Sequence, residues 1–217
     1  MHRSRATGAL LLLLAGVWQH GGRCAETSPE GVARGLQAWL DGTRDLKCRF
    51  EQSLDSGALG AGVPESGSML LLRPGRARWD YAEPERKIAI LDGDSTRVYL
   101  PADRQMIRGT LPAEGQALHA LLTRRSRVEE MFVPSLLPAV GGRGIRLRLV
   151  PRGKGESFEA VVLDLDPSSF AIRAAEVADG SGNVVRYRFY DMQRNRGVGE
   201  ESFHFQPPPG TEILEAP

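Results

Sequence analysis

The sequence predicts a mainly β protein with an α-helical lid: an unclosed antiparallel β-barrel of about eleven strands, covered by an N-terminal helix and a central helical insertion. Most of the chain consists of short segments in which apolar and polar residues alternate, which is the period of a strand with one dry face. The connections are brief and rich in Gly, Asp and Pro, as between neighbouring antiparallel strands. Two segments have helical periodicity instead. So many strands in one domain must curl, because a flat sheet would leave a whole apolar face in water.

The N-terminus has the pattern of a secretory signal peptide. Two arginines precede the apolar run 8–18, which is too short for a helix that crosses a hydrocarbon core, since such a helix needs about 20 residues. We expect residues 1–25 to be the signal peptide, with cleavage at an undefined point between residues 22 and 25. Residues 26–217 are then expected to form a single domain.

The two cysteines, Cys24 and Cys48, leave two alternatives open. Acylation of Cys24 would make it a lipid-anchored N-terminus, although Arg23 occupies a position where that processing requires a small residue. A single Cys24–Cys48 disulfide is possible only if Cys24 survives cleavage. Cys48 alternates with Leu46 and Phe50, so we expect it to pack as a small apolar side chain.

Charge and motifs exclude several functional classes. Without residues 1–25, which contain three arginines and no acid, 25 basic and 27 acidic residues remain, so nothing favours binding of nucleic acid or of anionic lipid. The four histidines are scattered, no cysteine pair has metal-ligand spacing, and no serine lies in a Gly-x-Ser-x-Gly elbow. We therefore expect no metal, no cofactor and no enzymatic activity.

The expected helices differ in position and role. The first is capped by Thr27 or Ser28, starts at Pro29 and ends at Asp41-Gly42. The insertion, from about residue 112 to 133, reads as two short helices separated near Ser126 and stopped by Pro134 and Pro138. Its candidates for the inner face of the lid are Leu118, Leu121 and Leu122.

The expected strands fall into two groups, one on each side of this insertion. They cover residues 46–54, 69–73, 77–81, 87–91, 96–100 and 105–108, then 145–149, 158–164, 171–177, 184–192 and 203–205.

The segment 73–81 carries most information about the barrel wall. Pro74 fixes its own φ and Gly75 tolerates positive φ, so the pair marks a turn that follows Arg73. Beyond the turn, Ala77, Trp79 and Tyr81 share one face of a strand and alternate with charged residues. The apolar face is expected to point into the barrel.

Three separated blocks of residues carry a resemblance to a known family. The first contains Phe50-Glu51-Gln52, Gly67, Leu71, Arg73-Pro74, Trp79-Asp80-Tyr81 and Pro84. The second contains Leu91-Asp92-Gly93, Val98-Tyr99, Pro101 and Gln105. The third contains Tyr187, Phe189, Gln193, Asn195 and Phe203-x-Phe205-x-Pro207-Pro208-x-Gly210. By the order and spacing of these blocks, the sequence resembles the outer-membrane lipoprotein carrier proteins, the LolA family.

The resemblance implies a function and a location. It implies a monomeric periplasmic chaperone of a Gram-negative bacterium, which carries acylated lipoproteins from an inner-membrane lipoprotein-releasing transporter to an outer-membrane lipoprotein receptor. The alternatives are a paralogue that carries other lipids or glycolipids, and an outer-membrane-anchored receptor of the same fold, which would require acylated Cys24.

The resemblance also implies roles for particular residues. Arg73 would be a latch that hydrogen-bonds lid backbone and holds the empty cavity shut. The proposed cavity-lining residues are Phe50, Leu71, Ala77, Trp79, Tyr81, Ile88 and Ile90, for each of which plain core packing predicts the same pattern. Ala77 is smaller than the bulky apolar residue expected there from relatives, which puts in doubt any handover step that relies on a large side chain.

Overall fold

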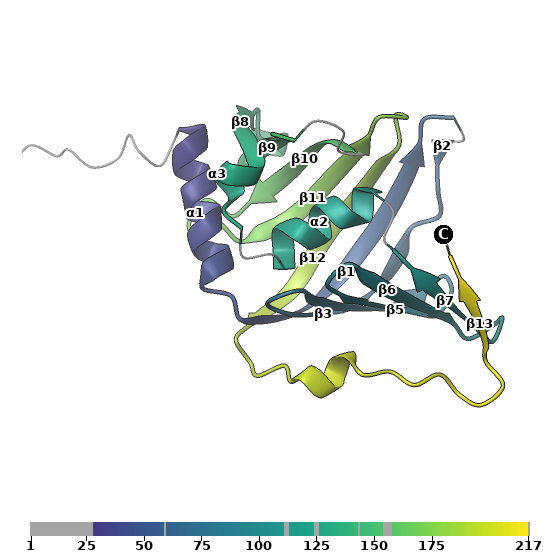
Figure 1. The fold of residues 1–217 in the computed structure, drawn as a ribbon. Coiled ribbons are helices and arrows are strands. Elements are labelled where there is room, and N and C mark those ends of the chain that lie inside the picture. The colour runs from purple at the N-terminus through teal and green to yellow at the C-terminus, as the bar shows by residue number, and fades with distance from the viewer. Residues whose placement is uncertain are drawn as a thin grey trace, which may run out of the picture.

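A computed structural model describes residues 28–58, 60–110, 113–123, 126–142, 144–153 and 158–216. In this part of the chain, thirteen strands form a single curled sheet, with helices on its concave side (Figure 1). The predicted signal peptide and Cys24 lie outside the described residues, so the alternatives for Cys24 stay open. No helix among the described residues is long and apolar enough to cross a membrane.

The first helix, α1 (Pro29–Asp41), begins and ends as the sequence predicts. The Ser28 hydroxyl accepts a hydrogen bond from the Gly31 amide (3.0 Å), and proline occupies the first turn. The apolar face of the helix, with Val32, Leu36 and Leu40, is buried in the core.

The strands follow one another around the sheet largely in chain order. Their bounds are β1 (Asp45–Ser56), β2 (Gly60–Ala61), β3 (Glu65–Leu72), β4 (Arg76–Glu83), β5 (Lys87–Asp92), β6 (Ser95–Leu100), β7 (Gln105–Gly109), β8 (Phe132–Leu137), β9 (Ile145–Pro151), β10 (Phe158–Leu165), β11 (Ile172–Asp179), β12 (Val184–Arg194) and β13 (Glu212–Glu215). The order across the sheet is β13-β7-β6-β5-β4-β3-β1-β12-β11-β10-β9-β8, with β2 paired to β1. The pairings are antiparallel except for β13, which runs parallel to β7. Because β13 and β8 end the order, the sheet is unclosed, as predicted.

The central insertion forms α2 (Ala113–Thr123) and α3 (Val128–Met131), and 3-10 turns lie at η1 (Val140–Gly142) and η2 (Glu200–Phe203). The sheet bends so that β3–β7 form a floor and β8–β12 an upright wall, and α2 lies in the angle between them (Figure 1). α1 and α3 cover the end of this angle next to β8 and β9.

The structure departs from the predicted strands at three places. The expected strand at Phe203 and Phe205 is wrong, because Phe203 ends the η2 turn and the last strand, β13, comes later. The insertion does not stay helical to Val133, since β8 begins at Phe132 and includes Pro134. Pro134 is tolerated because β8 is an edge strand. The short β2 lies inside a stretch that reads as a loop.

The C-terminal segment that follows β12 covers the outer side of the floor (Figure 1). Phe203 is buried there, and the Phe205 ring lies 5.2 Å from the ring of Tyr99. The guanidinium of Arg78 donates to the Ser202 carbonyl (2.9 Å). The floor is therefore covered on both faces, and apolar residues on its outer face are buried as well as those on its concave face.

A buried carboxylate joins the start of β1 to the chain that leaves β12. Asp45 is only 1% exposed and accepts hydrogen bonds from the amides of Arg196 (2.8 Å) and Gly197 (3.2 Å). Beside it, the Asn195 side chain accepts from the Arg44 amide (2.8 Å) and donates to the Gly42 carbonyl (2.8 Å). These bonds hold the carboxyl end of α1 against the sheet.

Candidate functional site

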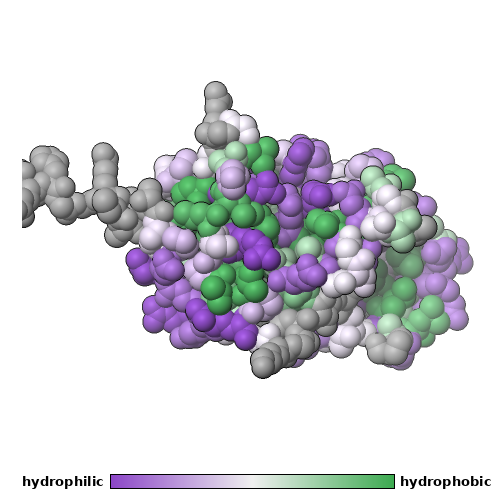
Figure 2. All heavy atoms as spheres, turned by 90° about the horizontal axis from the view of Figure 1, so that it is seen from above, coloured by the Kyte–Doolittle hydropathy of each residue, from purple (hydrophilic) through white to green (hydrophobic). Residues whose placement is uncertain are grey.

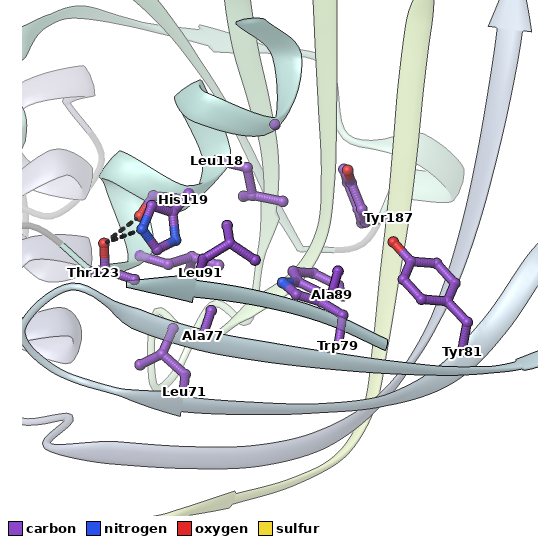
Figure 3. Close-up of a pocket in the computed structure, with 12 residues that line it drawn as sticks. Leu71, Ala77, Trp79, Tyr81, Ala89, Leu91, Leu118, His119, Thr123 and Tyr187 are labelled. Carbon is purple, nitrogen blue, oxygen red and sulfur yellow. Dashed lines mark hydrogen bonds between the residues drawn. The ribbon is translucent and has the colours of Figure 1, made fainter. Parts of the chain in front are cut away.

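A cavity of about 70 Å³ lies between α2 and the concave face of the floor (Figure 3). Residues from four strands and α2 border it: Leu71, Ala77, Trp79, Tyr81, Ala89, Leu91, Gly115, Leu118, His119, Leu122, Thr123 and Tyr187. Of the predicted lining residues, Leu71, Ala77, Trp79 and Tyr81 meet around this inner cavity.

Aromatic rings make up the wall of the inner cavity. Trp79 packs edge-on against Phe50, with 4.8 Å between ring centroids, and its ring lies 5.6 Å from that of Tyr187. Tyr81 also packs edge-on against Phe50, at 5.0 Å. Such edge-to-face contacts stabilise the fold by more than the burial of apolar surface alone. Phe50 is buried and is not among the residues that border the cavity, so it supports the wall from the core instead of lining it as expected.

The inner face of α2 closes the cavity from the other side. Leu118, Leu121 and Leu122 are all buried, and Leu118 and Leu122 border the cavity. At the end of the helix the Thr123 hydroxyl donates to the His119 carbonyl (2.7 Å) and lies 3.5 Å from the His119 ring (Figure 3).

A second, wider cavity of about 400 Å³ adjoins the first and shares Tyr81, Ala89, Gly115 and Tyr187 with it. Its other lining residues are Gln52, Leu54, Lys87, Thr96, Val98, Ile107, Gly109, Thr110, Val185 and Ala216. In Figure 2 hydrophobic residues gather at the right-hand end of the molecule, where β2, β7 and β13 lie in Figure 1. The wider cavity is bordered by the polar side chains of Gln52, Lys87, Thr96 and Thr110 besides those that it shares with the inner one.

The expectation that Ile88 and Ile90 line the cavity is corrected by the register of β4 and β5. Trp79 is paired with Ala89, and paired residues share a face of the sheet, so Ala89 points into the cavity. Ile88 and Ile90 alternate with it and lie on the outer face, which the C-terminal segment covers. The prediction selected the two large apolar residues, whereas the small Ala89 between them borders both cavities.

Other lining residues were also missed. Leu91, Val98 and Ile107 face the cavities from β5, β6 and β7, and Tyr187 faces them from β12. The signal was available for Leu91, which is paired with Ala77 across β4 and β5. It was not available for Tyr187, whose pairing with Gln52 joins strands far apart in the sequence.

Burial shifts the pKa values of two groups in this region. Desolvation, with smaller effects of Tyr187 and Glu65, raises the pKa of the Tyr81 hydroxyl well above its ordinary value. Desolvation likewise raises the pKa of the Cys48 thiol to about 12. Cys48 is buried in the core, as expected from the sequence, and is unreactive there because the thiolate is disfavoured.

The turn after β3 touches the ends of two helices. The Arg73 guanidinium donates through Nη1 to the Leu40 carbonyl near the end of α1. Two residues on, the Gly75 amide donates to the Thr123 carbonyl at the end of α2 (3.3 Å), and Gly75 has the positive φ (81°) that suits glycine. The cationic side chain lies at the negative end of the α1 dipole, which is a favourable position.

A comparison with protein-family models identifies the family. The model described as outer membrane lipoprotein carrier protein LolA matches residues 41–206. The chain belongs to the LolA family. This is a family of non-enzymatic carrier proteins, so the expectation of a non-enzymatic protein is confirmed.

Relatives named outer-membrane lipoprotein carrier protein match most of the chain. The relative from Dechloromonas aromatica is 28% identical over 186 residues, which cover 85% of this chain and 88% of that protein. The relative from Halorhodospira halophila is 33% identical over 156 residues, 70% of each chain. Among solved structures, a putative outer membrane lipoprotein-sorting protein domain from Vibrio parahaemolyticus aligns with a TM-score of 0.50 and 16% identity, covering 83% of this chain and 97% of that one. That structural likeness confirms the LolA-like fold.

Proposed function

We propose that the mature protein is a periplasmic chaperone that sequesters the acyl chains of lipoproteins and carries them from the inner to the outer membrane. The observation that carries this proposal is an apolar cavity between α2 and the concave sheet, in a chain that belongs to the LolA family. Relatives that are named outer-membrane lipoprotein carrier protein match this chain over most of their own length.

The physical need for such a cavity follows from the cargo. Each buried methylene is worth roughly 0.8 kcal/mol, so an acyl chain free in water would return to a membrane or aggregate. The wider cavity, at about 400 Å³, lies within the range of small-ligand sites, about 300–1,000 Å³, whereas the inner cavity of about 70 Å³ lies below it. Loading of long acyl chains therefore requires α2 to move away from the floor. This movement would join the two cavities into one.

Arg73 is proposed as the latch of this movement. Its bond to the Leu40 carbonyl anchors the turn to α1, and the same turn holds the end of α2 through the Gly75 amide. Motion of α2 away from the floor would pull on this turn. The proposed lining residues Leu71, Ala77, Trp79 and Tyr81 would then contact acyl chains, opposite Leu118, Leu121 and Leu122.

The proposed partners are acylated lipoproteins, an inner-membrane lipoprotein-releasing transporter and an outer-membrane lipoprotein receptor. The proposed location, the periplasm, depends on export by the segment 1–25. Because the net charge of the mature chain is near zero, contacts with membranes are expected to depend on the cargo and not on long-range attraction.

The test is a pair of assays on purified mature protein. The first is binding of a long-chain fluorescent lipid, and the second is formation of a soluble complex with an acylated lipoprotein released from inner-membrane vesicles. We expect both. Failure of both with folded protein would refute the proposed function. Mass spectrometry of the mature N-terminus separates a soluble carrier from a lipid-anchored receptor, since only the receptor has an acylated Cys24.

A further inference from the structure

Polar side chains interrupt the apolar concave face at the wider cavity. The rim cluster, defined as Gln52, Glu65, Tyr81 and Lys87, spans strands β1, β3, β4 and β5. Gln52 and Glu65 are paired across β1 and β3, and Tyr81 and Lys87 are paired across β4 and β5. A cavity for hydrocarbon alone would need no such group, because burying polar atoms costs free energy.

Three contacts join the four members of the rim cluster. The Lys87 ammonium lies 2.5 Å from a Glu65 carboxylate oxygen and 4.2 Å from the centre of the Tyr81 ring. The Tyr81 hydroxyl donates to the Gln52 side-chain carbonyl (2.8 Å). Lys87 thus holds the Tyr81 ring by a cation–π contact, and Tyr81 in turn holds one end of the Gln52 amide.

The other end of that amide is available to a ligand. A glutamine amide nitrogen has two donor hydrogens, and the Gln52 nitrogen donates to none of the described residues. The Tyr81 hydroxyl already occupies the oxygen of the Gln52 amide. Gln52 borders the wider cavity, so it offers the two N–H donors of its amide nitrogen to a ligand there.

A donor in an acyl-binding cavity has a narrow choice of partners. Acyl chains carry hydrogen-bond acceptors only at the carbonyl groups that attach them, by ester or amide bonds, to their head group. Gln52 borders the wider cavity together with the apolar Leu54 and Val185, so a carbonyl beside Gln52 leaves its chain in contact with apolar surface.

We propose that Gln52 donates a hydrogen bond to an ester or amide carbonyl of a bound acyl ligand, with Tyr81 and Lys87 as positioning residues. The proposal rests on the proposed function and adds to it the ligand group that is recognised. It places the junction between acyl chains and head group at the rim, and the chain ends under α2.

Thr96 is the competing donor in the same cavity. Thr96 as a residue is 6% exposed, and its hydroxyl oxygen has no hydrogen-bond partner among the described residues. Thr96 is paired with Leu91, four residues along β5 from Lys87, so it lies about 13 Å further along the strand direction, at 3.3 Å per residue. That position is level with Ala77, so Thr96 borders the wider cavity away from the rim cluster, where the proposal places methylene groups instead of carbonyls.

The test compares two lipids that differ only in their carbonyls: 1,2-dioctanoylglycerol, an ester, and 1,2-dioctylglycerol, its ether analogue. Dissociation constants are measured by displacement of a fluorescent apolar probe from the wild type, Gln52→Glu and Thr96→Val. Gln52→Glu keeps the acceptor for Tyr81 and removes both donors, and Gln52→Met repeats the test without a new charge. Gln193→Glu, at an exposed position of β12, is the matched control.

For each variant, the dissociation constant of the ether lipid is divided by that of the ester lipid. Comparing this ether-to-ester ratio between variants cancels the different partitioning of the two lipids, which is the same for every variant. We expect the ratio to be about 2- to 12-fold larger for the wild type, Gln193→Glu and Thr96→Val than for Gln52→Glu and Gln52→Met, as for the loss of one hydrogen bond. Equal ratios in all variants, or a decrease in Thr96→Val alone, would overturn the assignment to Gln52. Binding of neither lipid by folded wild type would refute the proposed function itself.

Discussion

Removal of the Arg73 side chain separates a latch from an ordinary helix anchor. Arg73→Leu deletes the guanidinium that donates to the Leu40 carbonyl near the end of α1. The chain offers a matched control at the same helix end, since Arg194 donates to the Trp39 carbonyl (3.1 Å) and lies over the Trp39 ring at 5.1 Å. Arg194→Leu therefore removes an equivalent cation from α1, but from a residue of β12 and not from the turn that touches α2.

The expected loss of stability is similar for both substitutions. A hydrogen bond that involves a charged group contributes about 1.5–3 kcal/mol to the free energy of unfolding. In a domain of this size each kcal/mol lowers Tm by about 2–4 °C, so we expect Tm to fall by about 3–12 °C in either variant. Thermal unfolding followed by circular dichroism measures this shift.

The two variants are expected to differ in binding of an apolar probe. If the Arg73 bond also holds α2 closed, its loss raises the population of the open form, and the apparent affinity for the probe rises by up to about 10- to 150-fold for 1.5–3 kcal/mol. Arg194→Leu should leave the affinity unchanged, because Arg194 does not belong to the β3–β4 turn. The Gly75 amide bond to Thr123 would remain in both variants.

The assay is titration with a fluorescent long-chain lipid, at a temperature well below both Tm values. A rise in affinity for Arg73→Leu alone supports the latch. Equal Tm shifts with unchanged probe affinity in both variants would show that Arg73 only anchors α1, and the latch proposal would then be wrong.

Three further predictions concern the core and the cavity wall. Burial raises the Cys48 pKa to about 12 in the folded state, so the buried thiol stabilises the fold fully below the ordinary thiol pKa of about 9, and this contribution is lost between pH 9 and 12. In a Cys24→Ser background, denaturant unfolding should show a free energy of unfolding that falls over this pH range with Cys48 present, and a smaller fall in Cys48→Ala. Ala89→Phe, in the wall of both cavities, should weaken lipid binding at least about fivefold through overpacking, whereas Ile88→Phe on the outer face should not; equal effects in the lipid titration would contradict the register. Asp45→Ala should lower the free energy of unfolding by about 1.5–3 kcal/mol, since it removes a buried carboxylate that accepts from the part-buried amides of Arg196 and Gly197, and a Tm unchanged within 1–2 °C would count against that role.

Local features of the fold were predictable because they depend on neighbouring residues. The cap at Ser28, the proline that follows it and the end at Asp41 define α1. Ten of the strands, β1, β3–β7 and β9–β12, lie where the alternating segments predict them, because the period of two reports a wall with one dry face. The unclosed, curled sheet followed from the number of strands and their short connections. β8 and β13 were missed because Pro134 and the exposed Ile213 and Leu214 lack the pattern of a half-buried strand.

The site was predictable only in part. Ala77, Trp79 and Tyr81, which a turn and strict alternation place on one face of β4, all border the inner cavity. The face of β5 that borders it was not predicted, because the C-terminal segment folds under the sheet and makes its outer side apolar as well, which removes the contrast between the two faces. Alternation cannot tell which of two buried faces borders a cavity.

The chain order of polar and apolar residues thus determined the helix, most of the strands, the curl of the sheet and the family resemblance. Packing between distant segments decided the rest: Ala89 and Tyr187 in the cavity wall, the Arg73 bond to the end of α1, and the Gln52–Tyr81–Lys87 contacts at the rim. The physical reason is that the alternation of apolar and polar residues shows only whether one face of a strand is buried. Which residues meet across that face depends on strand register and on the segments that cover it.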